Sequence, residues 1–170
     1  MALTVEDGSN VTGADAYVSL ADADAYYLAY NGVAWPGTDI EKESAIRRAT
    51  RYLDGIRWKG IKASGRSQPL EWPRFGVYDC DGYVVPSDEV PVEVVDACSL
   101  LSFYEAANPG GLDPNVTLTQ IAKREKVDVI EVEYNGAAVT AQNVRPVITG
   151  AMDLIKCLTL TGGQRFLERA

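Results

Sequence analysis

Asp79 and Asp81 are two closely spaced carboxylates that could act as a general acid and a general base. They lie in the segment YDCDGY, where Asp and Gly are also the residues that tight turns favour. The calcium-loop pattern DxDxDG is incomplete at this position. We therefore interpret Asp79 and Asp81 as residues of a turn.

The residue types present support few other catalytic mechanisms. The chain contains no histidine, which excludes a Ser/His/Asp triad, a Cys/His dyad and an HExxH zinc site. It also lacks GxxxxGK[ST], and no GxGxxG follows a strand pattern. We predict that the protein is not an enzyme and needs no cofactor or metal.

Three cysteines, Cys80, Cys98 and Cys157, are odd in number and widely spaced. No CxxC pair is present, and no histidine could complete a zinc site. We expect all three to be buried free thiols.

Half of the cationic side chains lie in one tract, residues 47–74. This basic tract has eight of the 16 Lys and Arg residues and two acids, so its net charge is +6, whereas the whole chain carries −8. Such asymmetry indicates a surface that meets a negatively charged partner, and the acidic remainder means that any contact with DNA must be local. The candidate contact residues are Arg47, Arg51, Arg57, Trp58, Lys59, Lys62, Trp72 and Arg74.

Two interpretations of the basic tract stay open. In the first, Trp58 and Trp72 stack on bases while the cations neutralise phosphates. In the second, both tryptophans are core residues, Arg51 pairs with Asp54 or Arg74 pairs with Glu71, and the other cations are solvated or dock on another protein. No nucleic-acid fold signature accompanies the tract.

The elements that would position these residues are mainly helical. Capping signals and apolar spacing predict helices at 19–30, 39–56 and 91–107, and a fourth from Pro146 to before Gly162. A strand is expected near 127–134, and a small hairpin around Asp81-Gly82 within 70–85. The predicted fold is a mainly α protein, a small bundle of about four helices with a minor β element and mobile termini.

Length and composition favour one domain, residues 1–160, followed by a tail at 161–170. No apolar run reaches the roughly 20 residues that span a bilayer, so no membrane partner is expected. The N-terminal residues MALTVEDGSN lack the features of a signal peptide. We expect a protein of the cytosol or of a virion.

Five segments, in this order, resemble the head-to-tail adaptor, or head completion, proteins of tailed bacteriophages. The resemblance covers residues 13–155. The family has also been labelled DnaT-like single-stranded DNA-binding protein, and both names are kept as hypotheses. The segments are AYVSLADADAYYLAY, EKESAIRRATRYLDGIRWKG, LEWPRFGVYDCDGY, VPVEVVDACSLLSFYEA and IAKREKVDVIEVEY.

The adaptor resemblance implies a structural subunit without chemistry, found at the head-tail interface of the virion and in the host cytoplasm during assembly. It would form a ring, commonly of twelve copies, between the portal protein and a tail-side connector protein, and packaged DNA would pass through the channel. The cations of the basic tract would then contact a neighbouring subunit or the portal. The alternative label implies single-stranded DNA binding with Trp58 and Trp72 as stacking platforms.

Overall fold

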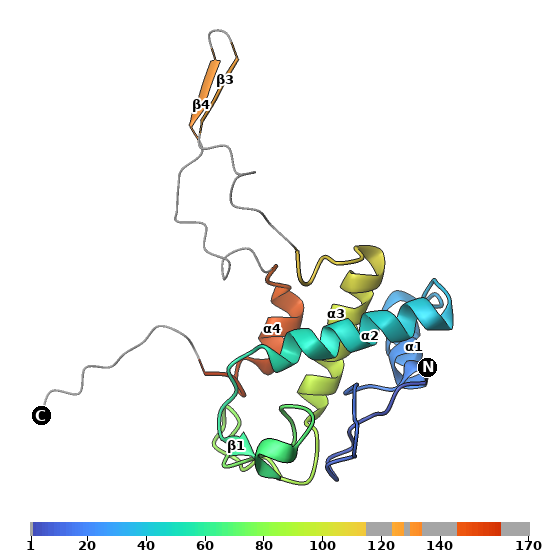
Figure 1. Cartoon of the computed structure of the whole chain (residues 1–170), viewed down its shortest axis with the longest axis vertical. Coiled ribbons are helices and arrows are strands. Elements are labelled where there is room, and N and C mark those ends of the chain that lie inside the picture. Colours follow the sequence, from blue (N-terminus) through green and yellow to red (C-terminus); the bar gives the residue numbers. More distant parts are fainter. Residues whose placement is uncertain (1, 115–123, 128–129, 134–145, 161–170) are drawn as a thin grey trace, which may run out of the picture.

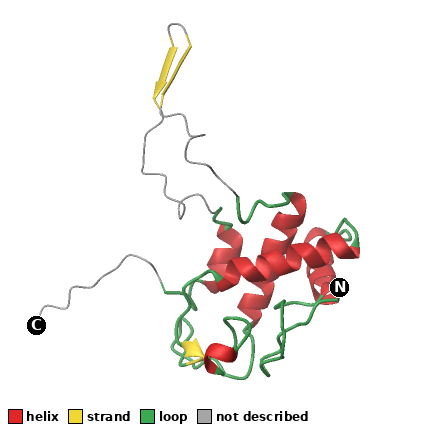
Figure 2. Ribbon diagram, in the orientation of Figure 1, coloured by secondary structure: helices red, strands yellow, loops and turns green. Residues whose placement is uncertain are grey.

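The computed structural model describes residues 2–114, 124–127, 130–133 and 146–160. Most of the regular structure is helical, as predicted (Figures 1 and 2). The helices are α1 (Leu20–Asn31), α2 (Asp39–Asp54), α3 (Val92–Ala107) and α4 (Thr149–Ile155). The mainly α fold and the approximate positions of all four helices are confirmed.

The first two helices begin at the capping residues that the sequence indicated. The Ser19 side chain accepts a hydrogen bond from the backbone N–H of Asp22 at the start of α1. At the start of α2, Thr38 and Glu41 form a capping box, in which each side chain accepts a hydrogen bond from the other residue's backbone N–H. Helix α1 ends at Gly32, whose left-handed conformation (φ 69°) suits a residue without Cβ.

The core forms where α2 crosses α3 and where α4 packs against α3 (Figure 1). The apolar stripe of α2 is fully buried at Ile46, Ala49 and Leu53. Facing residues of α3 include Val94 and Leu101, and both are also fully buried. This packing fixes the exposed side of α2, which carries much of the basic tract.

Helix α4 is shorter than predicted because it begins at Thr149 rather than at Pro146 and ends at Ile155. The chain then becomes extended, and Thr159 forms an isolated antiparallel bridge with Trp58. Backbone hydrogen bonds join Lys59 N to Leu158 O (3.0 Å) and Leu160 N to Arg57 O (2.8 Å). Pairing with residues 57–59 thus replaces further helical hydrogen bonds.

Residues 55–90 form a second region, which we call the loop-rich lobe. It contains strand β1 (Ile61–Lys62), a short 3-10 helix (Gly65–Ser67) and strand β2 (Arg74–Phe75). The two strands pair antiparallel, with Ile61 opposite Phe75 and Lys62 opposite Arg74.

The predicted turn at Asp81-Gly82 is present in this lobe, between the bridged residues Tyr78 and Val84. The Asp79 carboxylate accepts hydrogen bonds from the backbone N–H groups of Asp81 (2.9 Å) and Tyr83 (2.8 Å). This geometry confirms the interpretation of Asp79 as a turn residue.

The strand expected near 127–134 is instead part of a hairpin. Strand β3 (Arg124–Val127) pairs antiparallel with β4 (Ile130–Glu133), and Val127 lies opposite Ile130. The predicted strand corresponds to β4, and sequence analysis missed β3 because the alternation of Ile130 and Val132 with Glu131 and Glu133 marks β4 alone. Residue 134 lies outside the described residues.

The N-terminal segment, residues 2–18, is packed more closely than the expectation of mobile termini suggested. The Glu6 side chain is buried, and its carboxylate accepts hydrogen bonds from the backbone N–H groups of Gly8, Asn10 and Val11 at 2.9–3.0 Å. Ala16, Tyr17 and Val18 join the core. The predicted tail, residues 161–170, lies outside the described residues.

The prediction of three free thiols was wrong for two of them. Cys80 and Cys157 form a disulfide, with a Cα–Cα distance of 5.1 Å across a sequence separation of 77. The pairing of residues 158–160 with the loop-rich lobe brings the two cysteines together, which their spacing alone could not reveal. Cys98 is free and buried, as predicted, and burial raises the pKa of its thiol to about 12.

Candidate functional site

Several cations of the basic tract are engaged inside the fold. The Arg47 guanidinium pairs with the Asp15 carboxylate at 2.6 Å and donates to the Ala2 carbonyl oxygen at 3.1 Å. It also lies 3.6 Å from the Glu43 carboxylate. Arg47 therefore fastens the N-terminal segment to α2.

Arg74 is a buried arginine, with 7% of its surface exposed. Its guanidinium donates to the carbonyl oxygens of Lys59 (2.7 Å) and Gly60 (2.8 Å) and to the Glu71 carboxylate (2.7 Å). Lys62 approaches the same carboxylate at 3.1 Å. The predicted pair of Arg74 with Glu71 is confirmed, and both cations stabilise the lobe.

The two tryptophans of the tract are core residues. Trp58 is 4% exposed and Trp72 is 0% exposed, and their rings meet edge to face with centroids 5.5 Å apart. The indole N–H of Trp58 donates to the Leu53 carbonyl oxygen at 3.0 Å. The core interpretation is confirmed, because neither ring presents a face to solvent on which a base could stack.

A polar cluster beneath the lobe explains why Asp54 does not pair with Arg51. Its carboxylate accepts hydrogen bonds from the Tyr17 hydroxyl and from the backbone N–H of Glu71. The Tyr17 oxygen in turn accepts from the backbone N–H groups of Glu71 (3.0 Å) and Trp72 (3.1 Å). Burial raises the pKa of both Tyr17 and Asp54, and the cluster holds the EWPR turn in place.

Lys59 is the remaining lysine of the candidate set, and its ammonium donates to the Cys157 carbonyl oxygen at 2.5 Å. By contrast, Arg51 and Arg57 are exposed, and so is Arg66, which the candidate set omitted. Within the part of the chain that the structure describes, these three guanidinium groups have no ion-pair partner. They are the cations of the tract available to an external ligand.

An exposed ring lies in the same lobe as Arg57 and Arg66. Phe75 is 63% exposed, and its cross-strand neighbour Ile61 is 67% exposed. Sequence analysis missed Phe75 because it gave the stacking role to the two tryptophans. Its place after Arg74 would have been a signal only with Arg74 assigned to the interior, since neighbouring strand residues point to opposite faces.

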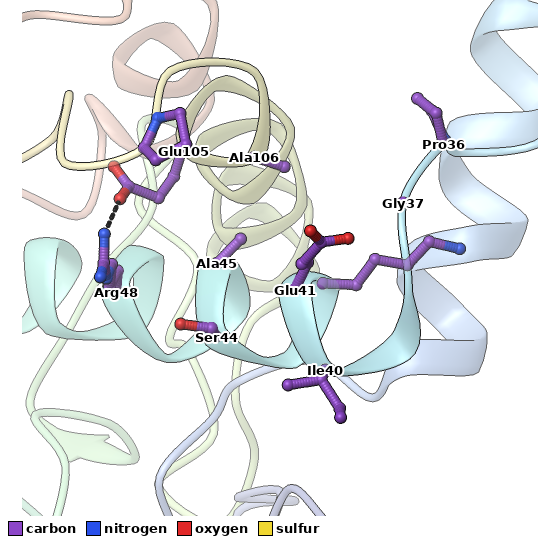
Figure 3. Close-up of a pocket in the computed structure, with 11 residues that line it drawn as sticks. Pro36, Gly37, Ile40, Glu41, Ser44, Ala45, Arg48, Glu105 and Ala106 are labelled. Atoms are coloured by element: carbon purple, nitrogen blue, oxygen red, sulfur yellow. Dashed lines mark hydrogen bonds and ion pairs between the residues drawn. The ribbon is translucent and has the colours of Figure 1, made fainter.

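Arg48 and Glu105 form an ion pair between α2 and α3, and Figure 3 shows them at one end of a cleft of about 510 Å³. The two side chains meet at 2.7 Å, and Glu105 is 2% exposed. Its carboxylate also accepts hydrogen bonds from the backbone N–H groups of Gly110 (2.6 Å) and Leu112 (3.0 Å).

Burial acts to raise the pKa of Glu105, but Arg48 and the two N–H groups outweigh burial and lower it. The cleft shown in Figure 3 is walled by Ile40, Ala45 and Ala106. A second cleft of about 430 Å³, lined in part by Arg51, lies on the other side of the ion pair. Glu105 thus neutralises Arg48 and leaves Arg51 as the unpaired cation there.

No helix in the described residues has both the length and the apolar character that a membrane span requires. Within the same residues, no group of three or more His, Cys, Asp or Glu side chains could hold a metal ion.

Comparison with known proteins gives one family. The family model described as "Putative DnaT-like ssDNA binding protein" matches residues 1–170. No curated protein and no solved structure matches the chain. The description corresponds to the second of the two family names that the sequence suggested. Because the match spans the whole chain, the protein belongs to this DnaT-like family.

Proposed function

We propose that the protein binds single-stranded DNA on the loop-rich lobe and the adjoining end of α2. Phe75 would stack on a base, while Arg51, Arg57 and Arg66 would contact phosphates. The observation that carries the proposal is that these three arginines are exposed and lack ion-pair partners among the described residues, in or next to the lobe that exposes Phe75. Membership of a family described as DnaT-like supports it.

The division of the basic tract also supports this proposal. Single-stranded DNA binding combines cations that follow the backbone with aromatic faces that accept bases of any sequence. Arg47, Lys62 and Arg74 are already neutralised by carboxylates and would add little. Because the chain is acidic overall, with a net charge of −8, binding would be confined to this surface.

The test is a fluorescence anisotropy titration with a labelled oligo-dT strand and with a duplex of the same length. Three phosphate contacts predict a slope of log K against log salt of about −2, which weakens binding about 15-fold between roughly 50 and 200 mM salt. Phe75→Ala should weaken binding by about tenfold, since stacking contributes about 1–3 kcal/mol per base.

Tyr30→Ala is the matched control, because Tyr30 is 73% exposed but lies in α1, away from the lobe. Its affinity should equal that of the wild type. Absence of oligo-dT binding at low salt would remove the proposal, and equal losses in Phe75→Ala and Tyr30→Ala would remove Phe75 as the stacking residue.

A second candidate function is the adaptor ring, and a different surface favours it. Leu28, Tyr30, Val33 and Ile40 are all more than half exposed where α1 leads into α2. Asp39 and Glu41 make this corner acidic. In Figure 1 the corner lies at the α1 side of the molecule, away from β1.

An acidic, apolar corner on one copy could contact the exposed arginines of the basic tract on the next. Such a heterologous contact closes into a ring when its rotation allows. In this proposal about twelve copies would assemble beneath a portal protein in the virion, bind a tail-side connector protein and surround the packaged DNA.

Electron microscopy with and without portal protein would test the ring. Ile40→Glu should abolish assembly, because Ile40 is 77% exposed at the corner, yet it should leave oligo-dT binding unchanged. A chain that stays monomeric at every concentration and forms no ring with portal would refute this second proposal.

A further inference from the structure

A groove beside the start of α3 has a chemistry unlike that of the proposed DNA surface. We call it the valine groove, because its apolar lining comprises five valines together with Pro86, Pro91 and Leu158; the valines are Val84, Val85, Val90, Val92 and Val95. It encloses about 560 Å³. Val84 and Val92 remain 65% and 64% exposed. Such a contiguous apolar surface is typical of a docking site.

The rim of the valine groove is acidic. Asp79, Glu89 and Glu93 line it, and its described lining contains no Lys or Arg. Carboxylates repel phosphates, so nucleic acid is a poor occupant. A peptide segment with apolar side chains between cations would match both the walls and the rim.

The chain itself carries such a segment a few residues beyond the groove. Residues 165–169 read RFLER, with Phe166, Leu167 and Glu168 between Arg165 and Arg169, so the segment has a net charge of +1. Leu158, the last groove-lining residue, lies only seven positions before Arg165. The disulfide between Cys80 and Cys157 fixes Leu158 against the loop-rich lobe.

The connection is long enough for a return to the groove. From Leu160, the last described residue, to Phe166 the chain can extend by at most about 20 Å. Gly162 and Gly163 lie within this connection, and glycine adopts the conformations that a chain reversal needs. A short connection also gives the segment a high effective concentration at the groove of its own chain.

We propose that the valine groove binds residues 165–169 of the same chain. Phe166 and Leu167 fill the space between the valines, and Arg165 and Arg169 pair with the acidic rim. This contact covers the exposed valines without using the proposed DNA surface.

Hydrogen exchange on the full chain, followed by mass spectrometry, tests the proposal. The amides of Val92 and Glu93, the first two of α3, have no acceptor among the described residues, whereas those of Val94 and Val95 donate to the Pro91 carbonyl oxygen. Seating of the tail should therefore slow exchange over residues 84–95. The double variant Phe166→Ser, Leu167→Ser should speed that exchange by about fivefold, a change typical of losing local protection.

Gln164→Ala is the matched control, because it alters the same segment without removing an apolar or charged side chain, and its exchange should equal that of the wild type. Higher salt should speed exchange in the wild type alone, since it screens Arg165 and Arg169 from the rim. Reversing the two charges gives a further check. Glu93→Arg should speed hydrogen exchange over residues 84–95, and adding Arg165→Glu to that variant should partly restore protection.

Equal exchange over residues 84–95 in the wild type and in the double variant would overturn the proposal. Protection that grows with protein concentration, together with faster sedimentation, would overturn it in favour of binding between two copies.

Discussion

The helical bundle and the loop-rich lobe each bury a charged side chain that satisfies loop backbone groups, but the two side chains have opposite charge and serve opposite kinds of backbone group. In the bundle, the Glu105 carboxylate accepts hydrogen bonds from two backbone N–H groups just after α3 and pairs with Arg48. In the lobe, Arg74 lies at the centre and donates to backbone carbonyl oxygens of three residues, as well as to a carboxylate. Helices satisfy most of their own backbone groups, whereas irregular loops need side chains to do so.

Gln68 makes the same point within the lobe. Its side chain is buried, accepts from the backbone N–H of Ser64 and donates to the carbonyl oxygens of Leu70 and Pro73. Polar side chains of the basic tract thus form hydrogen bonds with loop backbone groups and stabilise the loops. The exposed arginines are the cations that the lobe does not use in this way. We therefore separate structural cations, which are bonded within the fold, from candidate binding cations, which are exposed.

The largest expected effect tests whether the lobe has a core of its own. Trp72→Ala removes a ring that is 0% exposed and packs edge to face on Trp58. We expect a loss of about 3–5 kcal/mol in the free energy of unfolding, measured by urea denaturation. Phe75→Ala, three residues away and exposed, should change it by less than about 0.5 kcal/mol. Similar losses in both variants would contradict a packed lobe.

The disulfide joins the lobe to the segment after α4, so its removal should separate the two regions. Cys80→Ser should lower the free energy of unfolding by about 2–4 kcal/mol, because the bond closes a long loop in the unfolded chain. Reductant should lower the stability of the wild type by a similar amount and leave the variant unchanged. A wild type that is insensitive to reductant would show that the bond does not form in solution.

Substituting two arginines of the tract tests which cations stabilise the fold and which are available to bind DNA. Arg74→Met leaves the Lys59 and Gly60 carbonyl oxygens without their donor, and we expect a loss of about 2–3 kcal/mol in chemical denaturation. Arg66→Met, at an exposed position, should change stability by less than about 0.5 kcal/mol but should weaken oligo-dT binding. The opposite ranking of stabilities would mean that the assignment of the two cations is wrong.

The helices were predictable because their signals are local. Ser19, Thr38 and Glu41 are capping residues that act within one turn, and the apolar stripe of α2 repeats at helical spacing. Burial of Trp58 and Trp72 followed from their size and apolar character. These features depend on neighbours in sequence or on residue type.

The candidate site was less predictable because it depends on contacts distant in sequence. Arginine is rarely buried, so nothing local indicated that Arg74 would be inside while Arg66 stayed free. The pairing of Cys80 with Cys157 requires residues 158–160 to lie beside residues 57–59, a non-local contact without a motif. Phe75 was overlooked for a related reason, since its exposure follows from the inward position of Arg74.

The smallest expected effect concerns the pH dependence of two carboxylates: Asp54, which ends α2 and contacts the lobe through Glu71, and Glu105 of α3. Burial raises the pKa of Asp54 above its ordinary 3.8, so its contribution to stability is present below that value and is lost as pH rises through the raised pKa. Arg48 and two backbone N–H groups outweigh burial and lower the pKa of Glu105 below its ordinary 4.5. Its contribution is therefore present above 4.5 and lost as pH falls.

The stabilities of two amide variants, each relative to the wild type, should consequently change in opposite directions as pH rises from about 3 to 7. Denaturation measured across this range checks the prediction. Asp54→Asn should gain stability relative to the wild type as pH rises, because the wild type then has to ionise a buried carboxyl beneath the lobe. Glu105→Gln should lose stability relative to the wild type over the same rise, because it lacks the charge that Arg48 neutralises. Parallel pH profiles would mean that the half-buried Asp54 and the buried Glu105 meet the same kind of surroundings, against the contrast drawn between them.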